Sequence, residues 1–116
     1  MSDDIFCKII NGEVGADFVY RDEEVAVFRD INPKAPVHLL VVPVRHFTGI
    51  ADFAGHDGLL LGKMIRVAHD IAAKEGLDQG YRLIINEGAH GGKIVPHLHM
   101  HLLGGRDLGP KLVPGD

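Results

Sequence analysis

The sequence has a single cysteine, no tryptophan, no cluster of lysine and arginine, and no long hydrophobic run. Cys7 alone cannot form an internal disulfide, which fits a reducing compartment. The 12 basic and 16 acidic residues give a net charge of −4, and without a basic patch we expect no nucleic-acid-binding face. The longest apolar stretch, Leu39 to Val44, is far shorter than the about 20 residues of a membrane-spanning helix, so no membrane partner is expected.

Length and composition predict a single domain over residues 1–116. The 116 residues are 46% hydrophobic and 24% charged, which is typical of a globular chain with one core. The first residues, MSDDIFCKII, are acidic where a secretory signal would be positive, so we expect a cytoplasmic protein. Residues 106–116 are expected to form an irregular tail.

Local patterns predict an α+β fold. A short helix capped by Asp3 or Asp4 should end at Ile10, and a long helix over Asp57–Glu75 should end at Gly76. Five strands are predicted, at Asp17–Arg21, Val25–Asp30, Val37–Val42, Tyr81–Asn86 and His97–Leu103. Together they predict a mostly antiparallel five-stranded sheet with the long helix packed on it. That helix carries two adjacent apolar stripes, which is consistent with a partner subunit covering part of it.

The stretch HLHMH, residues 97–101, has a histidine at every second position. On an extended segment His97, His99 and His101 would share one face, while Leu98 and Met100 would point into the core. With eight histidines in 116 residues, about 0.04 such triplets are expected by chance. The triplet therefore needs an explanation.

Three interpretations remain open on spacing alone. The triplet could form a solvated polar face, or two of its histidines could share a Zn²⁺ with His38, His46 or Cys7. It could also carry nucleophilic chemistry, because neutral imidazole attacks phosphorus or carbonyl carbon and neighbouring imidazoles can orient and assist it. The glycine-rich stretch EGAHGG directly upstream favours a phosphate ligand, since flexible backbone lets several N–H groups converge on an anion.

Residues 97–103 resemble the His-φ-His-φ-His-φ-φ signature of the histidine triad (HIT) superfamily. The segments DIFCKIINGE, FRDINPKAPVHLLVVPVRH, GYRLIINEG and the GG before the triplet resemble its Hint branch, the nucleoside phosphoramidases. The resemblance extends from about Asp4 to Arg106. It implies a HIT-like fold whose sheet joins that of a second copy in a homodimer. It also implies hydrolysis of the P–N bond of an adenosine- or guanosine-type nucleoside 5′-phosphoramidate, which releases an amine and a nucleoside monophosphate without a cofactor.

The resemblance also implies roles for individual residues. His99 would be the nucleophile and form a nucleotidyl-histidine intermediate, and His101 would bind the phosphate and assist the leaving group. His97 would orient the nucleophile, His38 would complete the cluster from the adjacent strand, and Asp30 would bind the ribose. Further nucleotide-binding positions around the base and the phosphate match Ile5, Phe6, Ile9, Phe28, Ile31, Asn86, Gly92 and Val95.

Three departures from the family pattern stand out. Ile94 occupies the position of a phosphate-binding serine or threonine, and the tail, with Leu108-Gly109-Pro110, lacks a tryptophan that in some relatives reaches the partner's site. Some bacterial relatives bind zinc through a Cys-x-x-Cys pair and two histidines. Here DIFC stands in the place of that pair, so a zinc site would have only Cys7, His46 and His97 from the pattern.

Other functions remain compatible with these residues. The same histidine nucleophile would serve dinucleoside polyphosphate hydrolysis or nucleotidyl transfer, in which a P–O–P bond is cut. A nucleotide-binding scaffold with little turnover would keep the pocket, and a structural zinc protein would keep only the metal ligands.

Overall fold

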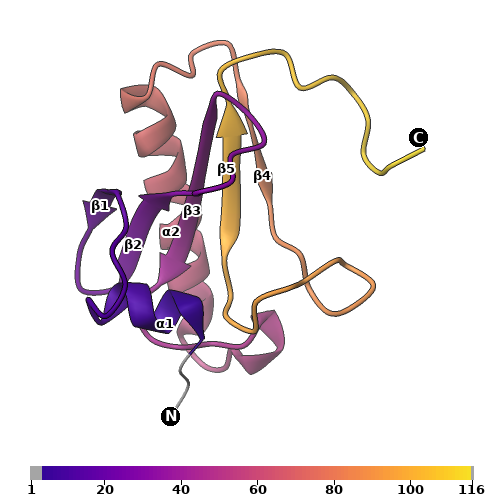
Figure 1. Cartoon of the computed structure of the whole chain (residues 1–116). Coiled ribbons are helices and arrows are strands. Elements are labelled where there is room, and N and C mark those ends of the chain that lie inside the picture. Colours follow the sequence, from indigo (N-terminus) through magenta and orange to yellow (C-terminus); the bar gives the residue numbers. More distant parts are fainter. Residues whose placement is uncertain (1–3, 116) are drawn as a thin grey trace.

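The computed structural model describes residues 4–115 and has the predicted α+β architecture (Figure 1). Its elements are α1 (Ile5–Ile10), β1 (Phe18–Arg21), β2 (Val25–Arg29), β3 (Val37–Pro43), the 3₁₀ turn η1 (Ile50–Asp52), α2 (Asp57–Lys74), β4 (Tyr81–Ile84) and β5 (Met100–Gly104). The strands form one antiparallel sheet in the order β1-β2-β3-β5-β4. Within residues 4–115, no helix has the length and apolarity to cross a membrane.

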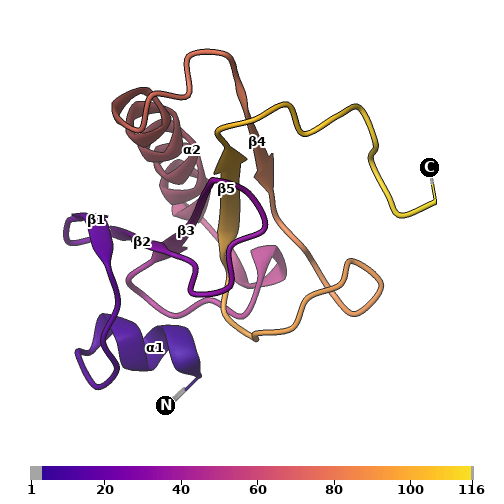
Figure 2. The ribbon, with the colours of Figure 1, turned by 45° about the horizontal axis from the view of Figure 1, so that its top comes forward.

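The two helices cover opposite faces of the sheet (Figures 1 and 2). On one face α2 buries Met64, Ala68 and Ile71 in the larger core cluster, and on the other α1 contributes to a smaller cluster. The central strand β3 serves both, because Leu39 belongs to the first cluster and Leu40 to the second. Burial on both faces explains why β3 reads as an unbroken apolar run rather than as an alternating one.

Both helix boundaries follow the predicted signals. The Asp4 side chain caps α1 by accepting a hydrogen bond of 2.8 Å from the backbone N–H of Cys7, while Asp3, the other predicted cap, lies outside the described residues. Gly76 follows the end of α2 with a φ of 78°, in the left-handed region that favours glycine.

The prediction of a strand from His97 is wrong for its first three residues, because β5 begins at Met100. Two backbone carbonyls that a longer strand would use for pairing accept hydrogen bonds from histidine side chains instead. His97 Nε2 donates to the Pro43 carbonyl at 3.2 Å, and His99 Nδ1 donates to the His97 carbonyl at 2.7 Å. Pro43, at the end of β3, also has no N–H to give. The other predicted element ends lie within two residues of those observed.

The predicted alternation of faces is confirmed despite the shorter strand. Leu98 and Met100 are buried in the core cluster beneath α2. The rings of His97 and His99 turn to the α1 side, where their centroids lie 5.8 and 4.9 Å from that of Phe6. The triplet therefore faces the space between α1 and the sheet.

Candidate active site

A pocket of about 560 Å³ opens between α1, the ends of β2 and β3, and the loop that precedes the histidine triplet. Predicted site residues that line it are Ile5, Phe6, Ile9, Phe28, Asp30, Ile31, His38, Asn86, Gly92, Val95, His99 and His101. His97 does not line the pocket, because it lies fully buried beneath it. Ile94 and Lys34 also line it, although sequence reasoning gave neither a binding role.

The protonation of His99 follows from its backbone contact. Its Nδ1 lies 2.7 Å from the carbonyl oxygen of His97, and a carbonyl can only accept a hydrogen bond. The Nδ1 atom therefore carries the proton, and in the neutral ring Nε2 keeps its lone pair. This atom has the state that a nucleophile requires.

A second chain of hydrogen bonds fixes His38 and His101. The backbone N–H of Lys34 donates to His38 Nδ1 at 3.0 Å, so the proton of the neutral His38 ring must be on Nε2. That Nε2–H lies 2.9 Å from His101 Nδ1, which accepts it. The neutral His101 ring then carries its own proton on Nε2, from which it can donate a hydrogen bond to a phosphate oxygen of the substrate. Sequence reasoning missed Lys34 because its contribution is a backbone group.

Burial keeps this cluster uncharged. Desolvation lowers the pKa values of His38, His97 and His99, and burial together with the nearby rings of His99 and His38 lowers the pKa of His101 to about 4. At neutral pH the rings are therefore neutral, which preserves the lone pair of His99. The Asp30 carboxylate lies 3.5 Å from His38 Nε2, and the charged side chains of Arg29 and Lys34 also line the pocket.

A second cluster lies behind the pocket and contains Asp4, Cys7, His46 and His97. His97 links the two clusters. Because its Nε2–H faces the Pro43 carbonyl, its Nδ1 keeps a lone pair, and this lone pair is 3.3 Å from Asp4 Oδ2. A proton shared between these two atoms, or a metal ion bound by both, would stabilise this contact.

The geometry of this cluster fits a tetrahedral zinc ion. Cys7 Sγ lies 3.5 Å from Asp4 Oδ2, 3.4 Å from His46 Nδ1 and 3.5 Å from His97 Nδ1. The oxygen and nitrogen atoms are 3.2 to 3.3 Å apart. Bond lengths of about 2.3 Å for sulfur and about 2.0–2.1 Å for nitrogen and oxygen give tetrahedral edges of roughly 3.3–3.6 Å. Asp4 thus adds a fourth atom to the three predicted from the sequence.

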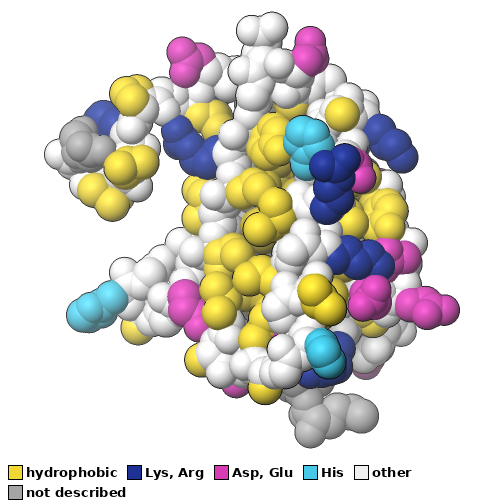
Figure 3. All heavy atoms as spheres, turned by 180° about the vertical axis from the view of Figure 1, so that it is seen from behind, with side chains coloured by type: hydrophobic (Ala, Val, Ile, Leu, Met, Phe, Trp, Pro, Cys, Tyr) yellow, Lys and Arg dark blue, Asp and Glu magenta, His cyan; other side chains and the backbone are white. Residues whose placement is uncertain are grey.

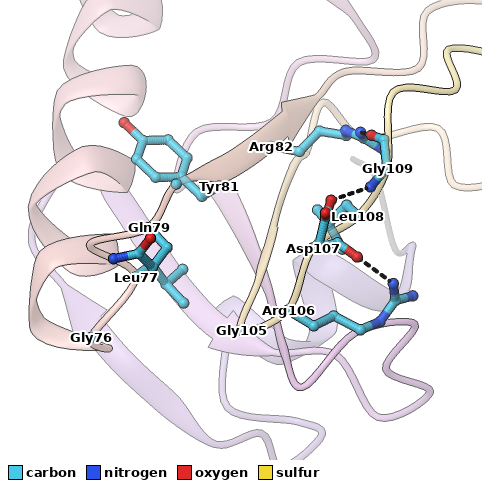
Figure 4. Close-up of a pocket in the computed structure, with 11 residues that line it drawn as sticks. Gly76, Leu77, Gln79, Tyr81, Arg82, Gly105, Arg106, Asp107, Leu108 and Gly109 are labelled. Atoms are coloured by element: carbon cyan, nitrogen blue, oxygen red, sulfur yellow. Dashed lines mark hydrogen bonds between the residues drawn. The ribbon is translucent and has the colours of Figure 1, made fainter.

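A different pocket, of about 720 Å³, lies at the far end of β5 (Figure 4). Its two arginines are engaged with the tail, since Arg82 donates to the Gly109 carbonyl at 2.5 Å and Arg106 to that of Asp107 at 2.9 Å. None of the predicted site residues lines it. We therefore assign the chemistry to the histidine pocket.

Comparison with known proteins identifies the same family that the histidine triplet indicates. A family model for the HIT domain matches residues 11–108. The chain belongs to the HIT family. Among curated HIT relatives, the purine nucleoside phosphoramidase of Escherichia coli is 50% identical over 109 residues, which cover 93% of this chain and 92% of that protein.

Solved HIT structures have the same fold. A HIT family hydrolase from Clostridium thermocellum is 40% identical, with a TM-score of 0.93 over 97% of this chain and 99% of that one. A histidine triad family protein from Mycobacterium smegmatis, described as zinc-bound, is 31% identical, with a TM-score of 0.78 over 90% of this chain and 76% of that one.

Proposed function

We propose that this HIT protein hydrolyses the P–N bond of purine nucleoside 5′-phosphoramidates, with His99 as the nucleophile. The observation that carries the proposal is the hydrogen bond from His99 Nδ1 to the His97 carbonyl, which leaves an unprotonated Nε2 on a ring that lines a nucleotide-sized pocket. The identity of half its residues with a purine nucleoside phosphoramidase supports the same activity here.

The first step exchanges one P–N bond for another. The His99 Nε2 lone pair forms a bond to phosphorus, and the bond from phosphorus to the substrate amine breaks. The substrate nitrogen takes up a proton from solvent, keeps the electron pair of the broken bond and leaves as the neutral amine, while the neutral His101 Nε2–H donates a hydrogen bond to a phosphate oxygen. The hydrogen bond from His38 Nε2–H to His101 Nδ1 orients this donor. The products are a free amine and a nucleotidyl-His99 intermediate.

The second step restores the enzyme. A water oxygen attacks phosphorus and releases a proton to solvent, which balances the proton taken up in the first step, while His101 Nε2–H still donates to a phosphate oxygen. The bond from phosphorus to His99 Nε2 breaks, its electron pair returns to the ring, and nucleoside monophosphate leaves. Backbone N–H groups of the glycine-rich loop hold the phosphate oxygens through both steps. Neither step requires a metal.

The remaining pocket residues bind the nucleoside. Phe6, Ile9 and Phe28 supply an apolar surface for the purine, and Asp30 accepts hydrogen bonds from the ribose hydroxyls. One Asp30 oxygen, Oδ1, already accepts the N–H of Asn32 at 2.8 Å, which fixes the carboxylate for the sugar. These groups contact parts of the substrate that do not react.

A direct test offers adenosine 5′-phosphoramidate and diadenosine polyphosphates side by side to the purified protein. We expect release of AMP from the phosphoramidate at a much higher kcat/KM. Faster cleavage of the polyphosphate would favour the P–O–P hydrolase or transferase instead. Tight AMP binding with no turnover of either compound would identify a nucleotide-binding scaffold.

We further propose that the cluster of Asp4, Cys7, His46 and His97 binds zinc as a structural ion. Its six interatomic distances and the lone pair of His97 Nδ1 support this assignment. Four protein ligands leave no open position, so the bound ion would supply structural cross-linking and no Lewis-acid chemistry. It would fasten His97, whose carbonyl holds the His99 ring, to the start of α1.

The face that carries α2 supports the proposed homodimer. Figure 3 shows hydrophobic side chains gathered along the middle of this face. On α2, Leu59 is 75% and Ile65 is 46% exposed, and the edge strand β4 is half-buried and contacts α2 through the Tyr81 hydroxyl, 2.7 Å from His69 Nδ1. A second copy would cover these side chains and extend the sheet at β4. Light scattering should give the dimer mass for the native protein and the monomer mass for Ile65→Glu.

A further inference from the structure

Glu87 and Lys93 flank the glycine-rich loop of the pocket, residues 88–92. Their neighbours Asn86 and Gly92 line the pocket, whereas neither Glu87 nor Lys93 does. Their side chains instead reach the segment 48–51, which is distant in the sequence. These two residues are thus placed to hold the loop from outside the pocket.

The contacts form a closed clamp around one turn of the backbone. The two Glu87 carboxylate oxygens accept the N–H groups of Ile50 and Ala51 at 3.3 Å each. The Lys93 ammonium donates to the Thr48 carbonyl and lies 3.6 Å from Glu87 Oε1. The Lys93 side chain is only 11% exposed, so its charge is largely shielded from water and depends on these partners.

Gly49 lies inside the clamp, and space rather than conformation explains why it is glycine. Its φ of −168° is extended backbone that any residue adopts. A Cβ atom there would lie 2.5 and 2.7 Å from the Glu87 oxygens and 2.7 Å from Lys93 Nζ. An alanine would therefore push both charged groups away without straining its own backbone.

The clamped segment is also bonded to the catalytic histidines. The Phe47 carbonyl accepts the N–H of Leu98 at 2.7 Å, between His97 and His99. Within the loop, Asn86 Nδ2 donates to the Gly91 carbonyl at 2.7 Å. Segment 47–51 therefore connects the triplet on one side with both ends of the loop on the other.

We propose that Glu87 and Lys93 are positioning residues, whose clamp around Gly49 sets the glycine-rich loop at the distance from His99 that phosphoryl transfer requires. The proposal rests on the proposed function for its kinetic consequence. Its effect on phosphate binding can be measured without turnover, because the clamp should determine where the loop holds a bound phosphate. Small displacements of a bound phosphorus from its nucleophile cost rate steeply.

The test compares Gly49→Ala and Lys93→Met with the wild-type protein. We expect kcat for adenosine 5′-phosphoramidate to fall at least tenfold in each, with a smaller change in KM. By calorimetry, AMP should bind at least tenfold more weakly, while adenosine, which has no phosphate, should bind as in wild type. Lys93→Arg keeps the charge and the Thr48 contact, and should recover most of kcat.

Two matched controls separate the clamp from general damage. Gly58→Ala adds a methyl group where nothing lies within 4 Å, and Lys63→Met removes an ion pair with Glu24 far from the pocket. Both should keep wild-type values. Wild-type kcat in Gly49→Ala and Lys93→Met, or an equal loss of AMP and adenosine affinity, would overturn the clamp. A wild-type protein without turnover would overturn the proposed function alone, because the AMP-to-adenosine comparison still tests the clamp.

Discussion

Replacing one ligand of the proposed zinc site should weaken metal binding while the protein still folds. The informative variant is Asp4→Asn, because an asparagine keeps the cap on α1 while its amide lacks the negative charge of the carboxylate. Cys7→Ser is its partner, since it removes the thiolate and leaves the cap in place. His56→Ala is the matched control, because that histidine is exposed at the start of α2 and its side chain makes no capping hydrogen bond.

The magnitude follows from mass action. A structural ion present at about 1,000 times its Kd stabilises the folded protein by about 4 kcal/mol. For a domain of this length, about 4 kcal/mol corresponds to a fall in Tm of roughly 10–20 °C when the ion is removed. We expect this fall when a chelator is added to the wild-type protein and to His56→Ala. Asp4→Asn should lose its metal at lower chelator concentration, and Cys7→Ser should be isolated without metal.

The assay combines metal content with a spectroscopic readout. Elemental analysis of protein purified without chelator should give one zinc per chain. Reconstitution with Co²⁺ should produce the intense visible bands of tetrahedral cobalt and a thiolate charge-transfer band in the near ultraviolet. Cys7→Ser should lack the charge-transfer band. A wild-type protein that is isolated metal-free and gives no cobalt spectrum under reducing conditions would refute the site, whatever its activity.

The other predictions concern the pocket. His99→Ala should abolish turnover and leave AMP binding measurable by calorimetry, because the base and ribose contacts lie elsewhere; residual turnover near the wild-type rate would identify another nucleophile. Asp30→Ala should mainly raise KM in steady-state kinetics, since a ribose contact is made equally in ground and transition states, and a lower kcat at constant KM would contradict that role. Burial and the rings of His99 and His38 lower the pKa of His101 to about 4 in the folded protein, so on acidification the unfolded chain takes up a proton at this residue before the folded protein does. The free energy of unfolding should therefore be highest above pH 6.5 and should fall by up to about 3 kcal/mol as the pH drops from 6.5 to 4. Urea titrations at several pH values would measure this fall. The fall should be smaller in His101→Gln.

Local sequence patterns predict most of the fold correctly. The apolar run of β3 and the repeat of Met64, Val67 and Ile71 along α2 predict the buried faces of these elements, because apolar residues recur with the period of each element. The second apolar stripe of α2 is buried only in part, since Ile65 is 46% exposed. The predicted pocket residues follow from the resemblance to one family, and the structure gathers them around one cavity. Contacts between distant backbone groups have no such local signal. The clamp around Gly49 joins residues about 40 positions apart, and no periodicity indicates that pairing.

The start of β5 is where local reasoning fails, and the failure has a chemical reason. Alternating polar and apolar residues predict a strand from His97, and a regular ladder there would use the His97 carbonyl to bond the neighbouring strand. The structure ends the ladder at Met100 and gives that carbonyl to His99 Nδ1 instead. A strand that ran through the triplet would leave the proton of His99 free to reside on either nitrogen. The interruption fixes the tautomer, so the residues that break the strand pattern are the ones that would make His99 a nucleophile.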